Sequence, residues 1–191
     1  MAANRIGKYV AIARFSARMC DFNSRLDRTM QPCRDALPAD YDAVKSINRE
    51  SPEALSLLDA DYFAQLLDLS DYFRVIELED EVAGYLFAIT HRAAYDGEEF
   101  QWFRQHYAAP FLYIDQIAIT TTARQQGLAQ LLYRDLQACA LEAGAQYLLC
   151  EVNYRPFNTA SQKFHRRLGF VQVGLLQTRE VTVSLLAKKL D

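Results

Sequence analysis

The sequence lacks the marks of several large classes of protein. Its 191 residues include four cysteines, but none forms a CxxC pair and none has a histidine at ligand spacing, so neither a zinc site nor a disulfide framework is predicted. No apolar run approaches the ~20 residues that a membrane span needs, and no signal-peptide hydrophobic region stands near the start. We therefore expect a soluble cytoplasmic protein with reduced thiols that binds neither metal nor membrane.

Two common phosphate-binding fingerprints are missing as well. The chain has no GxGxxG, which excludes the dinucleotide motif of a Rossmann domain, and no glycine-rich loop that ends in Lys-Ser or Lys-Thr, which excludes a nucleoside triphosphate loop. A pyrophosphate without bound magnesium remains compatible with the sequence. We expect no nucleic-acid partner.

The formal net charge of −3 hides a polarity along the chain. Residues 50–99 carry thirteen acidic side chains against two basic ones, whereas residues 100–191 carry ten basic against six acidic. An acidic middle suits a cationic ligand and a basic C-terminal half suits an anionic one, although a solvated surface would show the same charges.

Hydrophobic periodicity and turn residues predict one domain in which strands and helices alternate. Helices are predicted over residues 37–50, 59–69 and 158–168, and a longer amphipathic helix over 123–143 ends at Gly144. A hairpin with an acidic turn is predicted at 72–78 and 81–91, an aromatic-rich loop and helix at 92–110, and further strands at 29–36, 111–119, 146–152, 170–176 and 178–190. This order predicts a mixed α/β sheet covered by helices.

Residues 1–28 stand apart from this pattern. They carry six basic side chains against two acidic ones, and no acid occurs before Asp21. We interpret them as an N-terminal extension, with an organellar presequence or a tail that docks on the domain as alternatives. The predicted domain spans residues 29–191.

The stretch "TTTARQQGLAQ", residues 120–130, joins a predicted strand to the long helix. The unpaired N–H groups at the start of such a helix, together with the helix dipole, form a site for phosphate. Gly127 would let a ligand approach the backbone there. The alternative is that Gly127 only lets the helix pack tightly.

Two sequence motifs resemble those of the GCN5-related N-acetyltransferase (GNAT) superfamily. Residues 124–129, "RQQGLA", fit its R/Q-x-x-G-x-G/A motif, and "EVNYRPFNTASQKFHRRLGF", residues 151–170, follows at the expected distance and resembles its second signature. The resemblance covers residues 29–191 and is closest to a bacterial branch of predicted acetyltransferases. It implies a GNAT fold, with a mixed central sheet of about six to seven strands flanked by helices on both sides.

The resemblance also implies an activity, namely transfer of an acetyl group from acetyl-coenzyme A to a primary amine of a small molecule or peptide. The reaction would be direct aminolysis, without a metal or a covalent enzyme intermediate. A catalytically silent acyl-coenzyme A sensor is the alternative, and a homodimer is compatible with either.

The resemblance assigns residues to the coenzyme. The pyrophosphate would lie on the backbone of Arg124, Gln125, Gln126, Gly127, Leu128 and Ala129. The pantetheine arm would run along Ile117, Ala118 and Ile119, and Asn158 would contact coenzyme A.

Two residues are candidates for proton transfer. His165 stands where many relatives have a tyrosine that protonates the departing thiolate, a role that histidine can fill near neutral pH; a structural histidine is the alternative. Asp115 stands where relatives often carry a base that deprotonates the amine through water. Burying a carboxylate in an apolar strand costs free energy, so we expect Asp115 to serve either as this base or as the acceptor of a structural hydrogen bond. Cys150, on a strand whose pattern predicts burial, is expected to be an inert small hydrophobe.

The resemblance also implies that the acceptor binds between the first helices and the loop after the hairpin. Acids and aromatics gather there, and they suit an alkylammonium group through charge and cation–π attraction. Glu50, Tyr95 and Trp102 are the candidate acceptor residues. For Phe100 and Phe103 the alternative is a place in the core.

Overall fold

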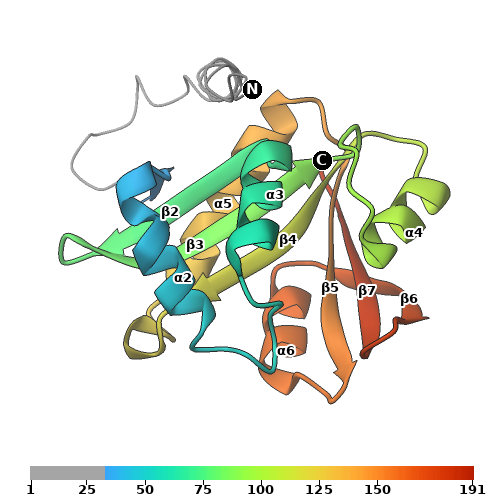
Figure 1. Ribbon diagram of the computed structural model, residues 1–191. Helices are drawn as coiled ribbons and strands as arrows, with labels where there is room; N and C mark the ends of the chain where they lie inside the picture. Colours follow the sequence, from blue (N-terminus) through green and yellow to red (C-terminus); the bar gives the residue numbers. More distant parts are fainter. Residues whose placement is uncertain (1–32) are drawn as a thin grey trace, which may run out of the picture.

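A seven-stranded mixed sheet forms the centre of the fold (Figure 1). The structure is a computed structural model that describes residues 33–191. The strand order is β1-β2-β3-β4-β5-β7-β6, in which β4 and β5 run parallel and the other neighbouring strands run antiparallel. The mixed α/β sheet predicted from the sequence is therefore confirmed. The proposed extension, residues 1–28, lies outside the described residues, as do residues 29–32 of the first predicted strand.

The elements follow one another in the predicted order. The strands are β1 (Cys33–Asp35), β2 (Tyr72–Leu78), β3 (Glu81–Thr90), β4 (Phe111–Ile119), β5 (Tyr147–Arg155), β6 (Val171–Gln177) and β7 (Thr182–Lys189). The helices are α2 (Tyr41–Asn48), α3 (Ala60–Leu69), α4 (Glu98–His106), α5 (Leu128–Glu142) and α6 (Thr159–Arg167).

Helices cover both faces of the sheet. On one face α5 packs through Leu132 and Leu136, with Phe164 of α6 beside it. On the other face α2, α3 and α4 pack on the strands, and Phe100 and Phe103 of α4 are fully buried. These two rings are therefore core residues, the alternative considered for them. The central strands β3, β4 and β5 send side chains into both cores because successive strand residues point to opposite faces.

Local turn and cap chemistry explains two of these elements. Glu79 and Asp80, which join β2 to β3, both have positive φ, 54° and 65°, as a two-residue hairpin turn that follows the twist of the strands requires. Asp59 caps α3, where its carboxylate accepts a hydrogen bond of 2.8 Å from the backbone N–H of Tyr62. This cap fixes the first turn of α3 and therefore the position of Tyr62.

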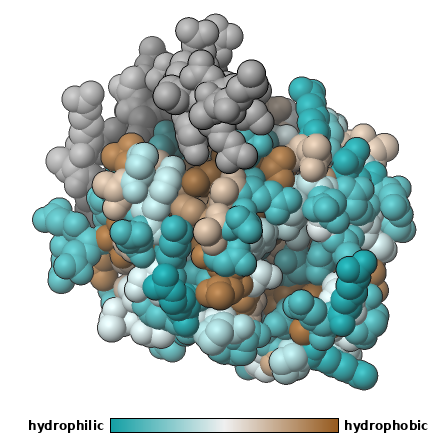
Figure 2. Space-filling model, in the orientation of Figure 1, coloured by the Kyte–Doolittle hydropathy of each residue, from teal (hydrophilic) through white to brown (hydrophobic). Residues whose placement is uncertain are grey.

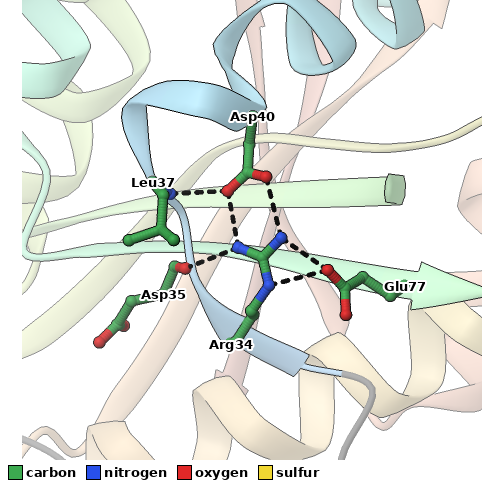
Figure 3. A network of polar contacts seen from close by, with 5 residues as sticks. All are labelled: Arg34, Asp35, Leu37, Asp40 and Glu77. Carbon is green, nitrogen blue, oxygen red and sulfur yellow. Dashed lines mark hydrogen bonds and ion pairs between the residues drawn. The ribbon is translucent and has the colours of Figure 1, made fainter. Parts of the chain in front are cut away.

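A polar network attaches β1 to the segment that starts α2 (Figure 3). The Arg34 guanidinium donates to Asp40 at 2.6 Å and to Glu77 of β2 at 2.6 Å. Asp40 is buried and also accepts from the backbone N–H of Leu37 at 2.7 Å. The hydrogen bond from Arg34 holds the pKa of Asp40 below its ordinary value, so this carboxylate stays ionised where it ties strand and helix together.

The long helix starts later than its apolar spacing predicts. Its first residue is Leu128, whereas the pattern extends back to Ala123. A short 3₁₀ turn, Thr121–Ala123, comes first, and Gln125 and Gly127 then adopt positive φ values of 64° and 85° that no α-helix contains. The residues between strand and helix therefore form a separate loop.

The cysteines differ from one another. Cys33 and Cys150 are free thiols, and burial raises the pKa of the Cys150 thiol well above its ordinary value, as expected for an inert cysteine. Cys139 is buried on α5. The prediction of reduced thiols is confirmed for Cys33 and Cys150.

The surface is largely hydrophilic on the face that Figure 2 shows. Hydrophilic side chains cover most of that face, and hydrophobic side chains occupy smaller areas between them. Over residues 33–191, no helix has the length and apolar character that crossing a bilayer would take.

Candidate functional site

The parallel strands β4 and β5 separate halfway along their length. Their register pairs Phe111 with Tyr147 and ends where Ile114 pairs with Cys150. Beyond that point residues 116–119 stay paired with β3, Asp115 lies at a register shift in that pairing, and residues 151–153 stay paired with β7. The two strands diverge in Figure 1. The backbone edges that face each other across this split are therefore open to a ligand.

Two carboxylates follow directly after Ile114 and Cys150, the last paired residues of β4 and β5. Asp115 follows Ile114 on β4, and Glu151 follows Cys150 on β5. Both project to the face that α3 and α4 cover, since Tyr62 of α3 donates to Asp115 and the buried Tyr113 donates to Glu151. The split therefore opens beside a pair of acids.

Tyrosine hydroxyls hold both acids in place. Tyr62 of α3 donates to Asp115 at 2.6 Å, and Tyr113 donates to Glu151 at 2.7 Å. The Tyr95 hydroxyl lies 3.4 Å from that of Tyr62. Among residues 33–191, no ion pair involves Asp115 or Glu151.

Burial without a cation changes the protonation of this pair. Burial raises the pKa of Asp115 to about 6, although the hydrogen bond from Tyr62 acts to lower it. Burial also raises the pKa of Glu151 well above its ordinary value, and the charges of Glu99 and Asp115 add to this effect. A pair of carboxylates of which one is ionised and the other neutral near pH 7 is typical of acid–base sites.

The loop between β4 and α5 presents free backbone donors. Within the described part of the chain, the backbone N–H groups of residues 125–129 have no hydrogen-bond acceptor. Alternating backbone conformations at Gln125 and Gly127 turn such groups into an anion-binding concavity. A Cβ atom added to Gly127 would meet no atom within 4 Å, so tight helix packing does not explain this glycine. The positive φ of Gly127 and the open space in front of it explain why glycine occupies this position.

Arg124 and Glu50 hold this loop from the outside. Arg124 donates through Nε to the Ile119 carbonyl at 3.1 Å and through a terminal nitrogen to the Ser51 hydroxyl at 2.8 Å. Glu50 accepts from the backbone N–H of Thr121 at 2.6 Å and from the Thr120 hydroxyl at 2.9 Å. Both side chains tie the segment after α2 to the end of β4.

The three candidate acceptor residues are not all brought together. Tyr95 is buried and joins the group around Asp115 through Tyr62. Glu50 contacts the loop before α5 instead. Trp102 stacks on His106 with 3.8 Å between ring centroids and lies against Gly174 of β6. Their acceptor-binding role stays a prediction, and Tyr95 is the one that lies with the acids.

The strand and helix positions predicted for coenzyme A flank the split. Ile117, Ala118 and Ile119 lie on β4 past the last pair with β5. Asn158 caps α6, where its side-chain oxygen accepts from the backbone N–H of Ser161 at 3.0 Å. Their contacts with the coenzyme stay predictions.

His165 is a buried imidazole with partners at both ring nitrogens. Nε2 lies 2.7 Å from the Tyr133 hydroxyl of α5, and Nδ1 lies 2.8 Å from the Ser161 carbonyl. Nδ1–H therefore donates to Ser161, and Nε2 accepts from Tyr133. Burial lowers the pKa of His165, which favours the neutral ring. This geometry favours a structural role, and the general-acid role stays a prediction.

We expect His165→Phe to reduce stability more than catalysis. The ring volume is nearly kept, but the buried Tyr133 hydroxyl loses its acceptor, at a cost of about 1–3 kcal/mol. The double variant Tyr133→Phe/His165→Phe should recover part of this loss because both polar partners are then gone. Thermal unfolding and kcat measured on the folded variants provide the check, and a fall in kcat of about 10²-fold or more would support the general-acid role instead.

Sequence reasoning missed three residues of the cluster around Asp115, namely Glu151, Tyr62 and Tyr113. Glu151 is a charged residue within the apolar strand "QYLLCEV", the same signal that singled out Asp115. Tyr62 gives no comparable signal, since its contact with Asp115 joins α3 to a strand 53 residues further along the chain.

No group of three His, Cys, Asp or Glu side chains that could hold a metal ion occurs among residues 33–191.

Comparisons with known proteins extend these observations. A family model described as "Acetyltransferase (GNAT) family" matches residues 37–170. No curated protein matches the chain significantly in sequence.

Solved structures share the fold at low sequence identity. Ribosomal-protein-alanine N-acetyltransferase from Brucella melitensis superposes with a TM-score of 0.62 at 22% identity, covering 83% of this chain and 99% of its own. FeeM, an N-acyl amino acid synthase from uncultured soil microbes, gives 0.64 at 20% identity, with 83% and 90% covered. Ard1 from Thermoplasma volcanium gives 0.63 at 16% identity, with 83% and 97% covered.

Proposed function

The chain belongs to the acetyltransferase (GNAT) family, and from this premise we propose that it transfers an acetyl group from acetyl-coenzyme A to a primary amine of a small molecule or peptide. The observation that carries the proposal is the pair Asp115 and Glu151. These acids stand where β4 and β5 separate, and no cation neutralises them within the described chain.

The loop before α5 supports binding of the coenzyme. A pyrophosphate needs several donors and open space, and the backbone N–H groups of residues 125–129 have no other acceptor. The positive φ of Gly127 aims these groups without placing a side chain in front of them. Ile117, Ala118 and Ile119 would then line the path of the pantetheine arm to the split.

Acetyl-coenzyme A supplies an activated thioester, so the protein has to deliver a neutral amine to it. Asp115 can take the proton of the ammonium form, directly or through water, because its pKa of about 6 leaves it ionised at neutral pH. The raised pKa of Glu151 favours its neutral form beside the ionised Asp115, so Asp115 supplies the negative potential that attracts the cationic form of the acceptor. Tyr62 holds the Asp115 carboxylate in one orientation.

The acceptor would enter between α3, α4 and the acids. Tyr62, Tyr95 and Tyr113 surround the carboxylates with aromatic rings and hydroxyl groups, an environment that favours an ammonium group. A protein named as a ribosomal-protein-alanine N-acetyltransferase has the same fold, which is consistent with a peptide amine as one class of acceptor.

We expect the rate of acetyl transfer to fall below pH 6 as Asp115 becomes protonated. The base must be ionised, and its pKa is raised to about 6, so kcat/KM should drop about tenfold for each further pH unit. The acceptor amine ionises too, and therefore the informative quantity is the ratio of the parent rate to the Asp115→Asn rate. This ratio should decline below pH 6, and a ratio that is constant with pH would remove Asp115 as the base.

Binding followed by turnover tests the proposal against the sensor alternative. Acetyl-coenzyme A should raise the melting temperature of the protein, and thiol release should then be followed across a panel of primary amines. Thiol release that depends on one class of amine supports the transferase. Stabilisation without release by any amine would support the sensor.

A further inference from the structure

A cavity of about 470 Å³ lies between α6 and the strands β6 and β7. Its two sides differ in chemistry. The helix side is polar throughout and consists of Thr159, Gln162, Lys163 and Arg166. The strand side is mainly apolar, with Phe170, Val171 and Leu186 beside Gln172, and Phe157 lies just before α6. A ligand that fits between them needs a polar group along one edge and an apolar body along the other.

This cavity is separate from the proposed acetyl-transfer site. Helix α6 turns His165 toward Tyr133 of α5, and Ser161 lies one turn before His165 and hydrogen-bonds to its ring. Gln162 and Arg166 each come one residue later, about 100° further around the helix axis. None of the residues predicted for the coenzyme or the acceptor lines the cavity.

One buried donor in the cavity side has no partner. The side-chain amide nitrogen of Gln162 is inaccessible to solvent and has no hydrogen bond, the one such buried side-chain atom in the part of the chain that the structure describes. Buried polar groups are nearly always hydrogen-bonded, and an exception requires an explanation. Since no solvent-sized probe reaches this nitrogen, it does not face the cavity as the side chain stands, and the amide has to rotate about its last torsion before it can donate to an acceptor there.

The charges beside that amide are positive and unpaired. Lys163 and Arg166 lie three residues apart on α6, so they are neighbours on one helix face. Within residues 33–191 neither forms an ion pair. A planar guanidinium, an ammonium and an amide N–H together suit a carboxylate.

We propose that this cavity binds a small monocarboxylic acid with an apolar body. The carboxylate accepts hydrogen bonds from Gln162, Lys163 and Arg166. The apolar body packs against Phe170, Val171 and Leu186. This site does not depend on the acetyl-transfer reaction.

Calorimetric titration of the full chain with octanoate tests the proposal. We expect saturable one-site binding that persists when coenzyme A is saturating. Octanol lacks the carboxylate and acetate lacks the apolar body, so both should bind at least about tenfold more weakly, and so should inorganic phosphate. Displacement of octanoate by coenzyme A, or equal affinity for octanol or phosphate, would overturn the proposal.

Variants of α6 locate the binding. The pair Lys163→Gln/Arg166→Gln should weaken octanoate at least about tenfold, whereas Arg167→Gln, an exposed basic residue of the same helix outside the cavity, should leave affinity unchanged. Equal effects of both changes would indicate attraction by the general charge of α6 and overturn the site.

Gln162→Leu separates a ligand-binding role from a structural one. Because the amide is buried without a partner, its removal should raise the melting temperature by about 2–4 °C and weaken octanoate about tenfold or more. A lower melting temperature with unchanged octanoate affinity would show that Gln162 serves the fold and not a ligand.

Discussion

Replacement of Asp115 by asparagine is expected to lower kcat about 10²–10⁴-fold, the usual contribution of general acid–base assistance. The amide cannot accept the proton of the acceptor amine. Affinity for coenzyme A should not change, because Asp115 stands beside the split and not in the loop before α5. Initial rates at saturating acetyl-coenzyme A and amine measure the effect.

The same substitution should stabilise the fold at pH 7. The pKa of Asp115 is about 6 in the folded protein against an ordinary value of 3.8, so the folded state binds the proton more tightly and loses stability as the pH rises from about 4 to 6. Each unit corresponds to about 1.4 kcal/mol, and asparagine removes this penalty. The melting temperature of Asp115→Asn should therefore exceed that of the parent at pH 7, and the difference should vanish below pH 4.

Asp135 offers a matched control for this substitution. Its carboxylate also accepts from a tyrosine, Tyr72, at 2.7 Å, but it is paired with Arg74 at 3.1 Å and lies on α5. Asp135→Asn should lower stability because it breaks an ion pair, and it should leave kcat of the folded enzyme nearly unchanged. Equal losses of kcat in the two variants would argue against a specific role for Asp115.

The second large effect is expected from Gly127→Val, which should weaken coenzyme A binding about 10- to 100-fold. Several hydrogen bonds to a charged phosphate are at stake, each contributing about 1.5–3 kcal/mol, and the valine side chain fills the open space before the backbone N–H groups. Titration of the folded variant with coenzyme A measures the affinity.

Gly144→Val controls for backbone strain. Gly144 follows the other end of α5 with a φ of 74°, and a Cβ there also meets nothing within 4 Å. Both variants place a side chain in the left-handed region, at a cost of about 1–2 kcal/mol in stability. Only Gly127→Val should lose coenzyme affinity. If both bound coenzyme A as the parent does, the phosphate-site assignment would be wrong.

Much of the fold could be predicted because its information is local. The acidic turn at Glu79 and Asp80 and the regular apolar spacing of α5 each depend on neighbouring residues. The start of α5 was predicted too early, since Ala123 fits the apolar spacing although the left-handed backbone at Gln125 interrupts the helix. The spacing of apolar residues indicates which side of a helix is buried, but it does not show where the backbone leaves the helical conformation.

The site was harder to predict because it depends on distant contacts. Asp115 was predicted from the resemblance to relatives that carry a base at this position and from its charge within an apolar strand, yet its partner Tyr62 comes from α3. The match between Asp115 and Glu151 depends on the register of β4 and β5, which sequence patterns do not give. The bond between His165 and Tyr133 joins two helices, so the sequence alone could not distinguish a structural from a catalytic histidine.

Transfer of an isotopically labelled acetyl group tests the central claim most directly. The protein would be incubated with labelled acetyl-coenzyme A and a panel of primary amines and peptides, and the products would be analysed by mass spectrometry. The account predicts a labelled amide that forms in step with free thiol and is reduced at least about 10²-fold by Asp115→Asn. Coenzyme binding without any labelled amide across the panel would contradict it.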